Sequence, residues 1–164
     1  MEKLRIVIVV MLAAALSACK PTPKEAGAFN NDLMAQQKAV VVKYDQLLET
    51  FDTYVSEKMD AALVVLMDQV AESQANVQDL TPIVGGENLK QEVLNYISVF
   101  EDVTNNDLDY LVRLYKLPEN EFTAEVRLQW ETRYKDVDTR IKEASARLKE
   151  AQKEYANYFN LDIK

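Results

Sequence analysis

Residues 123–158 have the sequence TAEVRLQWETRYKDVDTRIKEASARLKEAQKEYANY, in which apolar side chains recur every three or four positions. The stripe that they form consists of Val126, Trp130, Tyr134, Val137, Ile141, Ala144, Leu148, Ala151, Tyr155 and Tyr158. This spacing predicts an amphipathic α-helix, and the side chain of Thr123 suits an N-cap. At 1.5 Å per residue the helix would be roughly 50 Å long.

The same period continues towards the N-terminus in two further segments. The first starts after Asn30 or Asn31, either of which is a plausible N-cap, and the second starts after Ser56, which is its expected cap. Their stripes are Leu33, Val40, Tyr44, Leu47, Phe51 and Tyr54, and then Met59, Leu63, Leu66, Val70, Val77 and Leu80. No Gly or Pro marks the boundary at residues 52–56, so a helical hairpin, which we favour, and one long kinked helix both stay open.

A loop at residues 82–87, with Gly85-Gly86, separates these segments from another helix that ends before Pro118. Its apolar face carries Leu89, Val93, Tyr96, Ile97, Phe100, Leu108, Leu111 and Leu114. The polar run at residues 101–107 crosses its middle and predicts a kink there. Short links between helices of similar length favour antiparallel neighbours. We therefore expect an all-α fold, an antiparallel up-down-up-down four-helix bundle of long helices.

The N-terminus has the three parts of an export signal: Lys3 and Arg5, an apolar core at residues 6–16, and small residues after it. This core is shorter than the ~20 residues that a membrane-spanning helix needs. It closes on Leu16-Ser17-Ala18-Cys19, which resembles the lipobox of bacterial lipoproteins. The alternative is an ordinary cleaved signal that happens to have a cysteine at this position.

The lipoprotein resemblance implies a lipid anchor. Signal peptidase II would recognise Leu16, Ser17, Ala18 and Cys19 and cut before Cys19, which would carry a diacylglyceryl thioether and usually an acylated amine, with palmitate as a typical chain. Two or three acyl chains hold a protein to a membrane far more firmly than one. In enterobacteria-type lipoproteins an aspartate after the cysteine favours the inner membrane, so Lys20 favours the outer one. The face, periplasmic or surface, stays open.

These patterns divide the chain into three parts. Residues 1–18 are the expected signal peptide, and residues 19–29 are the lipidated cysteine and a flexible tether, because Pro21, Pro23 and Gly27 interrupt any periodicity. Residues 30–164 are expected to form a single helical-bundle domain.

Composition excludes several kinds of function. The chain has no histidine and only one cysteine, so His-dependent triads, di-iron Glu-x-x-His sites, disulfides and Cys-ligated metals are not expected. Gly85-Gly86 matches neither of the two common phosphate-binding patterns: it lacks the lysine of the Walker loop and the glycine spacing of the Rossmann motif. Removing Glu2, Lys3 and Arg5 with the signal leaves 26 acidic and 17 basic residues, a net charge of −9. Such a surface does not suit nucleic acid. We expect a protein that is not an enzyme, with no cofactor and no metal.

Three groups of side chains still offer chemistry. Asn105, Asp107 and Asp109 alternate like EF-hand ligands, but Tyr110 stands where that loop needs glycine. Two pairs of carboxylates, Asp107 with Asp109 and Glu119 with Glu121, could act as general acid and base if they were buried with shifted pKa values. An enzyme would need such carboxylates buried against Arg127, Arg133 or Arg140. Solvated side chains explain both patterns more simply. The third group consists of aromatic residues on the inward stripes: Tyr44, Phe51, Tyr54, Tyr96, Phe100, Trp130, Tyr134, Tyr155 and Tyr158. Core packing is their expected role, and the lining of a ligand cavity is the alternative.

The mature chain also resembles an uncharacterised family of helical bacterial surface lipoproteins. The resemblance rests on Phe29-Asn30-Asn31-Asp32, on residues 82–86 and on residues 155–163. It implies a fold and a location but no active-site residues. Two functions therefore remain: a non-catalytic interaction or structural module with an envelope protein as partner, and a carrier of a lipid or small ligand in a cavity between helices. The oligomeric state stays open.

Overall fold

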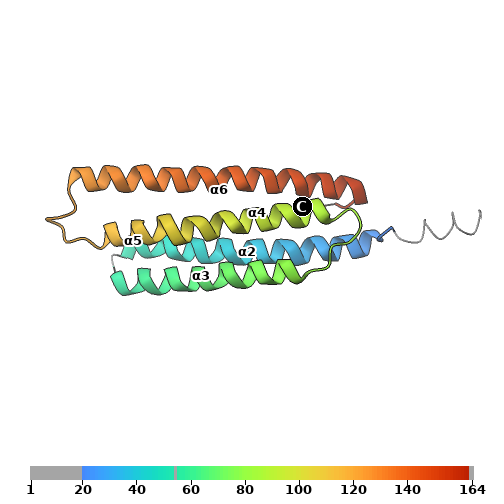
Figure 1. The fold of residues 1–164 in the computed structure, drawn as a ribbon, viewed down its shortest axis with the longest axis horizontal. Coiled ribbons are helices and arrows are strands. Elements are labelled where there is room, and N and C mark those ends of the chain that lie inside the picture. Colours follow the sequence, from blue (N-terminus) through green and yellow to red (C-terminus); the bar gives the residue numbers. More distant parts are fainter. Residues whose placement is uncertain (1–19, 54, 163–164) are drawn as a thin grey trace, which may run out of the picture.

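The computed structural model describes residues 20–53 and 55–162. Its elements are α2 (Pro23–Thr53), α3 (Ser56–Asp79), α4 (Glu87–Val103), the π-helix η1 (Thr104–Leu108), α5 (Asp109–Tyr115) and α6 (Ala124–Phe159). Every regular element of these residues is helical, which confirms the predicted all-α class. Because α4, η1 and α5 adjoin one another without a break, the protein has four long helical rods in its described part (Figure 1). None of the described helices is long and apolar enough to cross a membrane.

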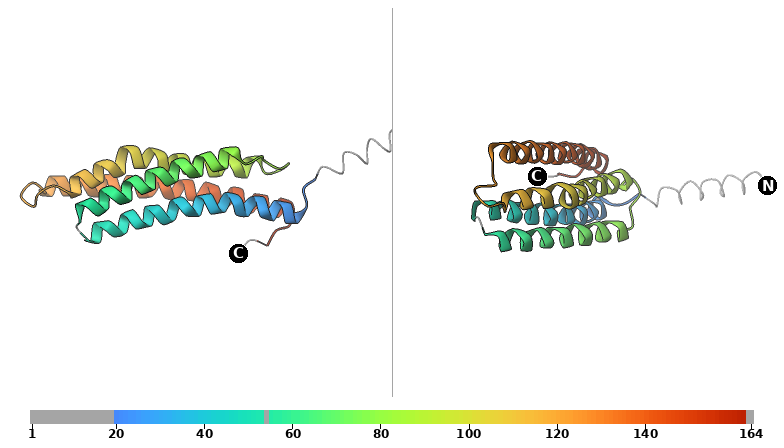
Figure 2. Two further views of the ribbon diagram at one scale, coloured as in Figure 1. Left: turned by 90° about the horizontal axis from the view of Figure 1, so that it is seen from below. Right: turned by 60° about the vertical axis from the view of Figure 1, so that its left-hand side comes forward.

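The four rods lie side by side and pack mainly in neighbouring pairs. The most extensive contacts join α2 to α3 and α4 to α6, and α3 also packs on α4. The links between the rods lie at the two opposite ends of the elongated molecule, as Figures 1 and 2 show. The loop at residues 80–86, the start of α2 and the end of α6 lie at one end, which we call the Gly85 end. The α2–α3 link and the link at residues 116–123 lie at the other, the Pro118 end.

The boundary between the first two helices is the favoured hairpin and not a kink. The Ser73 hydroxyl donates a hydrogen bond to the Gln36 carbonyl (3.3 Å), and the Asn76 side-chain amide donates to the Gln36 side chain (3.2 Å). Gln36 and Ser73 are almost equally far along the chain from the break, so α3 folds back along α2. Ser56 is the first residue of α3 and not its N-cap; Val55 holds that position, without a side-chain cap bond in the described structure.

The predicted start of the first helix is wrong, because α2 begins at Pro23 and not after Asn30 or Asn31. Thr22 and Glu25 form a reciprocal capping box: the Thr22 backbone N–H donates to the Glu25 carboxylate (2.8 Å), and the Glu25 N–H donates to the Thr22 hydroxyl (3.3 Å). The hydrogen bonds from the Thr22 backbone and side chain lower the pKa of Glu25. Pro23 comes directly after the cap, where its missing N–H costs nothing.

The first turns of α2 also belong to the core, so the flexible tether expected at residues 20–29 does not exist in that form. Ala26 and Phe29 are buried, and the Tyr155 hydroxyl of α6 donates to the Ala26 carbonyl (2.9 Å). Burial raises the pKa of Tyr155 to about 12, which keeps the hydroxyl protonated and able to donate. Only residues 20–22 lie between Cys19 and the first helix.

The predicted apolar stripes form the core. Phe100 lies at its centre, fully buried, with its ring 5.4 Å from that of Tyr44 on α2 and 5.1 Å from that of Tyr96 on α4. Five members of the α6 stripe are buried, and four are half-buried. The buried ones are Val137, Ala144, Leu148, Ala151 and Tyr155, and the half-buried ones are Val126, Trp130, Tyr134 and Ile141. One predicted member is wrong: Tyr158 is 50% exposed, and Phe159 points inward instead.

The polar run in the third rod does interrupt the α-helix, as a π-helix over Thr104–Leu108. Part of this run faces the interior of the bundle, because the side chains of Val103, Thr104 and Asp107 are all buried. Short π-helical segments often occur at functional sites, which directs attention to this segment.

Two caps fix the ends of α6. The Thr123 hydroxyl accepts a hydrogen bond from the Val126 N–H (3.3 Å), so the predicted N-cap is confirmed. At the other end Asn160 adopts a left-handed conformation (φ 53°), and the Leu161 N–H bonds to the Ala156 carbonyl (2.9 Å). This arrangement is a Schellman cap, after which the chain leaves the helix.

Candidate functional site

The lipobox residues Leu16, Ser17, Ala18 and Cys19 lie outside the described residues, and the structure leaves their predicted roles open. The next residue, Lys20, is described. It lies at the Gly85 end, where its ammonium nitrogen is 4.7 Å from the centre of the Tyr158 ring.

The buried acidic residue of the described core is Asp107, in the π-helix, where it is 5% exposed. Its Oδ1 lies 2.8 Å from Nε of Arg133, and its Oδ2 lies 2.9 Å from Nη1 of Arg140, both on α6. Arg140 also pairs with Asp102 of α4 and approaches Asp136 at 3.8 Å. We call Asp102, Asp107, Arg133 and Arg140 the ion cluster. It joins the third rod to α6 at mid-length.

The geometry of the ion cluster suits a structural tie better than acid–base catalysis. Oδ2 of Asp107 accepts a hydrogen bond from Arg140, and Oδ1 is ion-paired with Arg133, so both oxygens face a guanidinium group and neither is placed to take a proton from a substrate. Desolvation lowers the pKa of Arg140, but hydrogen bonds to Asp102 and the charges of Asp102 and Asp107 outweigh it and raise that pKa above its ordinary value. Arg140 therefore stays charged throughout the physiological pH range.

Replacing Asp107 with alanine should destabilise the fold by about 2–3 kcal/mol. Breaking a fully buried ion pair costs about 3–5 kcal/mol, but Arg133 and Arg140 are partly exposed and would regain water. The matched control is Asp109→Ala, which removes an exposed pair with Arg113 and should cost at most about 1 kcal/mol. Urea unfolding measures both. Equal losses for the two variants would refute the special role of Asp107.

The structure separates the calcium-like triplet. Asn105, Asp107 and Asp109 lie on one continuous rod and face different ways: Asn105 is exposed, Asp107 contacts α6 and Asp109 pairs with Arg113 at 2.9 Å. No group of three or more possible metal ligands comes together in the described part of the chain. Glu119 and Glu121 are exposed in the link that precedes α6.

The aromatic residues spread along the whole bundle and do not converge on one cavity. Tyr44, Tyr96 and Phe100 lie near the middle, where burial raises the pKa of both tyrosines. Phe51 and Trp130 meet Tyr115 towards the Pro118 end, where the Tyr115 hydroxyl donates to the Phe51 carbonyl (2.9 Å). At the Gly85 end the contacting rings are those of Phe29, Tyr155, Tyr158 and Phe159. Tyr54, the other predicted member, is not described.

Two buried polar atoms have no hydrogen-bond partner among the described residues: Nε1 of Trp130 and Oγ1 of Thr104. The Trp130 ring is stacked on Tyr134 at 5.1 Å. Thr104 lines a hollow of about 160 Å³ between α3 and the third rod, with Met67, Val70, Ala71, Glu101 and Asn105. A site for a drug-sized ligand is usually 300–1,000 Å³. This hollow could hold water molecules or a very small molecule, not an acyl chain.

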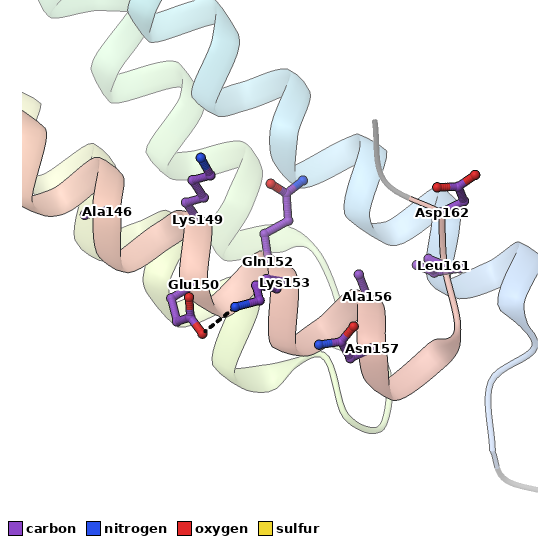
Figure 3. A pocket seen from close by; sticks show the side chains of 9 residues that line it. All are labelled: Ala146, Lys149, Glu150, Gln152, Lys153, Ala156, Asn157, Leu161 and Asp162. Atoms are coloured by element: carbon purple, nitrogen blue, oxygen red, sulfur yellow. Dashed lines mark hydrogen bonds and ion pairs between the residues drawn. The ribbon is translucent and has the colours of Figure 1, made fainter.

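Larger hollows lie on the outer faces. One of about 600 Å³ runs along the second half of α6 to Leu161 and Asp162 (Figure 3). Its walls include the long, charged side chains of Lys149, Glu150 and Lys153, and the last two form an ion pair at 3.5 Å. A second, of about 780 Å³, lies beside Tyr110, Leu128 and Arg133. Both are open depressions on the surface whose walls mix apolar and charged groups, and neither is an enclosed cavity that would bury most of a lipid.

Sequence reasoning misses several residues that shape these features. Phe29 falls within the expected tether, and Tyr115 and Phe159 stand outside the predicted stripes, although all three are in aromatic contacts. The Thr22-x-x-Glu25 spacing of a capping box is present in the sequence and could have identified the true start of α2.

No protein-family model matches this chain, and neither a curated protein nor a solved structure is significantly similar to it.

Proposed function

We propose that this protein is a lipid-anchored bacterial envelope lipoprotein whose helical domain binds another envelope protein or fills a structural role, without catalysis. The observation that carries this proposal is the sequence Leu16-Ser17-Ala18-Cys19 after a short apolar segment, with a folded helix beginning four residues later. Acyl chains on Cys19 would bind the membrane, and the domain would act next to it. Lys20 after the cysteine favours the outer membrane over the inner one.

For the arrangement of the helices we propose an antiparallel up-down-up-down bundle. Its support is the alternation of the links between the two ends of the molecule, together with the extensive packing of α2 on α3 and of α3 on α4. Such a bundle has a continuous core and leaves one face of each helix for solvent or partners.

The outer face of α3 is a suitable surface for a protein partner. Val64 and Val65, in adjacent positions, are 54% and 44% exposed. Along its length α3 carries five acidic residues, Glu57, Asp60, Asp68, Glu72 and Asp79, against one lysine, Lys58, and of the five Asp60 is paired with Lys116 (2.6 Å). A partner would then offer an apolar contact together with basic side chains.

The carrier function receives less support. The aromatic side chains that would line a ligand cavity pack against one another or bond to backbone carbonyls. The hollow beside the buried Thr104 is too small for an acyl chain.

Native mass spectrometry of the full protein, gently extracted from its own membrane, tests the proposed function. We expect the mass of residues 19–164 plus acyl chains, alone or with a second protein. A discrete small mass that survives desalting would instead support the carrier. A chain that starts after an ordinary signal cleavage, without acyl mass, would overturn the anchor.

A further inference from the structure

An uncharged loop, an exposed tyrosine and the beginning of the described chain meet at the Gly85 end. Gly85 adopts φ 88°, which glycine tolerates, and a Cβ built on it would lie only 2.7 Å from Cε1 of Tyr158. The ammonium group of Lys20 lies 4.7 Å from the centre of the same Tyr158 ring. The residue next to the proposed anchor therefore touches the same tyrosine that contacts the loop.

This end also exposes apolar surface. Val84 is 57% exposed and Tyr158 is 50% exposed, both among the most exposed large apolar side chains of the described chain. Residues 81–86, with the sequence TPIVGG, carry no charge. Tyrosine is a residue that the membrane interface favours, because its ring is apolar and its hydroxyl can stay in water.

The chain leaves little room between the anchor and this end. From Cys19 to Pro23, the first residue of α2, the backbone can extend at most about 14 Å at ~3.5 Å per residue. The capping box of Thr22 with Glu25 orders the last part of that path. A domain held so close to the bilayer by its acyl chains meets the lipid headgroups with the Gly85 end first.

We propose that the Gly85 end docks on the bilayer, with Val84 and Tyr158 in the interfacial region and the helices pointing away from the membrane. This inference rests on the proposed lipidation of Cys19. The occupant is a zwitterionic lipid surface and not an anionic one, because Lys20, Lys24 and Lys90 at this end are offset by Glu25, Asp79, Glu87 and Asp162. The acyl chains supply the affinity, and the two apolar side chains set the orientation, since tethering makes even a weak second contact effective.

The single cysteine of the chain makes a direct experiment available. Once Cys19 is acylated, a cysteine introduced by Val84→Cys is the only free thiol and can carry a spin label. The acylated protein is reconstituted into vesicles of phosphatidylcholine and phosphatidylethanolamine. Electron paramagnetic resonance then compares collisions of the label with oxygen, which enters the bilayer, and with a water-soluble nickel chelate. The matched control is Leu128→Cys, also on the surface but 30 residues from Tyr158 along α6, or about 45 Å.

We expect the label at position 84 to collide several-fold less with the nickel chelate, and more with oxygen, than the label at position 128. Interfacial side chains lie about 5–10 Å into the headgroup boundary, where a charged chelate is scarce. If both labels are equally open to the chelate while the protein floats with the vesicles, the docking is wrong and the anchor stands. If the protein neither floats nor carries acyl mass, the proposed function fails and the docking fails with it.

Discussion

Replacing Cys19 with serine should abolish incorporation of radioactive palmitate. The thiol forms the thioether that carries the diacylglyceryl group, and a serine hydroxyl cannot replace it in that reaction. The loss of labelling is expected to be complete, because Cys19 is the only cysteine of the chain.

The control for this variant is Ser17→Ala, which keeps a small side chain in the lipobox and should leave labelling unchanged. Labelling is measured in the same cells for both variants. Palmitate that persists in the Cys19→Ser protein would refute the anchor, since the chain has no other cysteine.

Replacing Phe100 with alanine should destabilise the domain by about 3–5 kcal/mol, the range for truncating a large buried aromatic side chain. The Phe100 side chain is fully buried and contacts rings on two helices, edge-on against Tyr44 at 81° and tilted against Tyr96 at 50°. Both the transfer of the ring from water and its aromatic contacts are lost. Urea unfolding of residues 20–164 can be followed by the fluorescence of Trp130, which is the only tryptophan.

Leu128→Ala is the comparison for this core variant. Leu128 is 63% exposed, so its truncation should change the free energy of unfolding by no more than about 0.5 kcal/mol. If the two variants unfold at the same urea concentration, the central position of Phe100 in the core is wrong.

Periodicity predicts most of the helices because burial in a bundle needs little more than the right residue every three or four positions. It works best for α3 and α4, where Leu63, Val70 and Phe100 are all buried as expected. It fails at the start of α2, where Pro23 and Gly27 look like helix breakers. A proline at the first helical position is compatible with a helix, and Gly27 costs only part of what a well-packed helix gains.

The ion cluster could be predicted only in part. Arg133 and Arg140 are seven residues apart, two helical turns, so the sequence places both on one face of α6. Whether Asp107 or Asp109 meets them depends on how the third rod is rotated about its axis. That rotation is set by the π-helix, whose hydrogen bonding no apolar pattern reveals.

The five residues of η1 therefore set how far α5 is rotated about the axis of the rod relative to α4. Each residue of an α-helix advances the side-chain direction by about 100°, so the length of this segment fixes which way everything after it points. Taking out one residue there would shift every later side chain by one position, so that the exposed Arg113 would take the buried direction of Val112 and Leu111 the half-buried direction of Tyr110. In this rod the number of residues between Val103 and Asp109 is as strongly constrained as their chemistry.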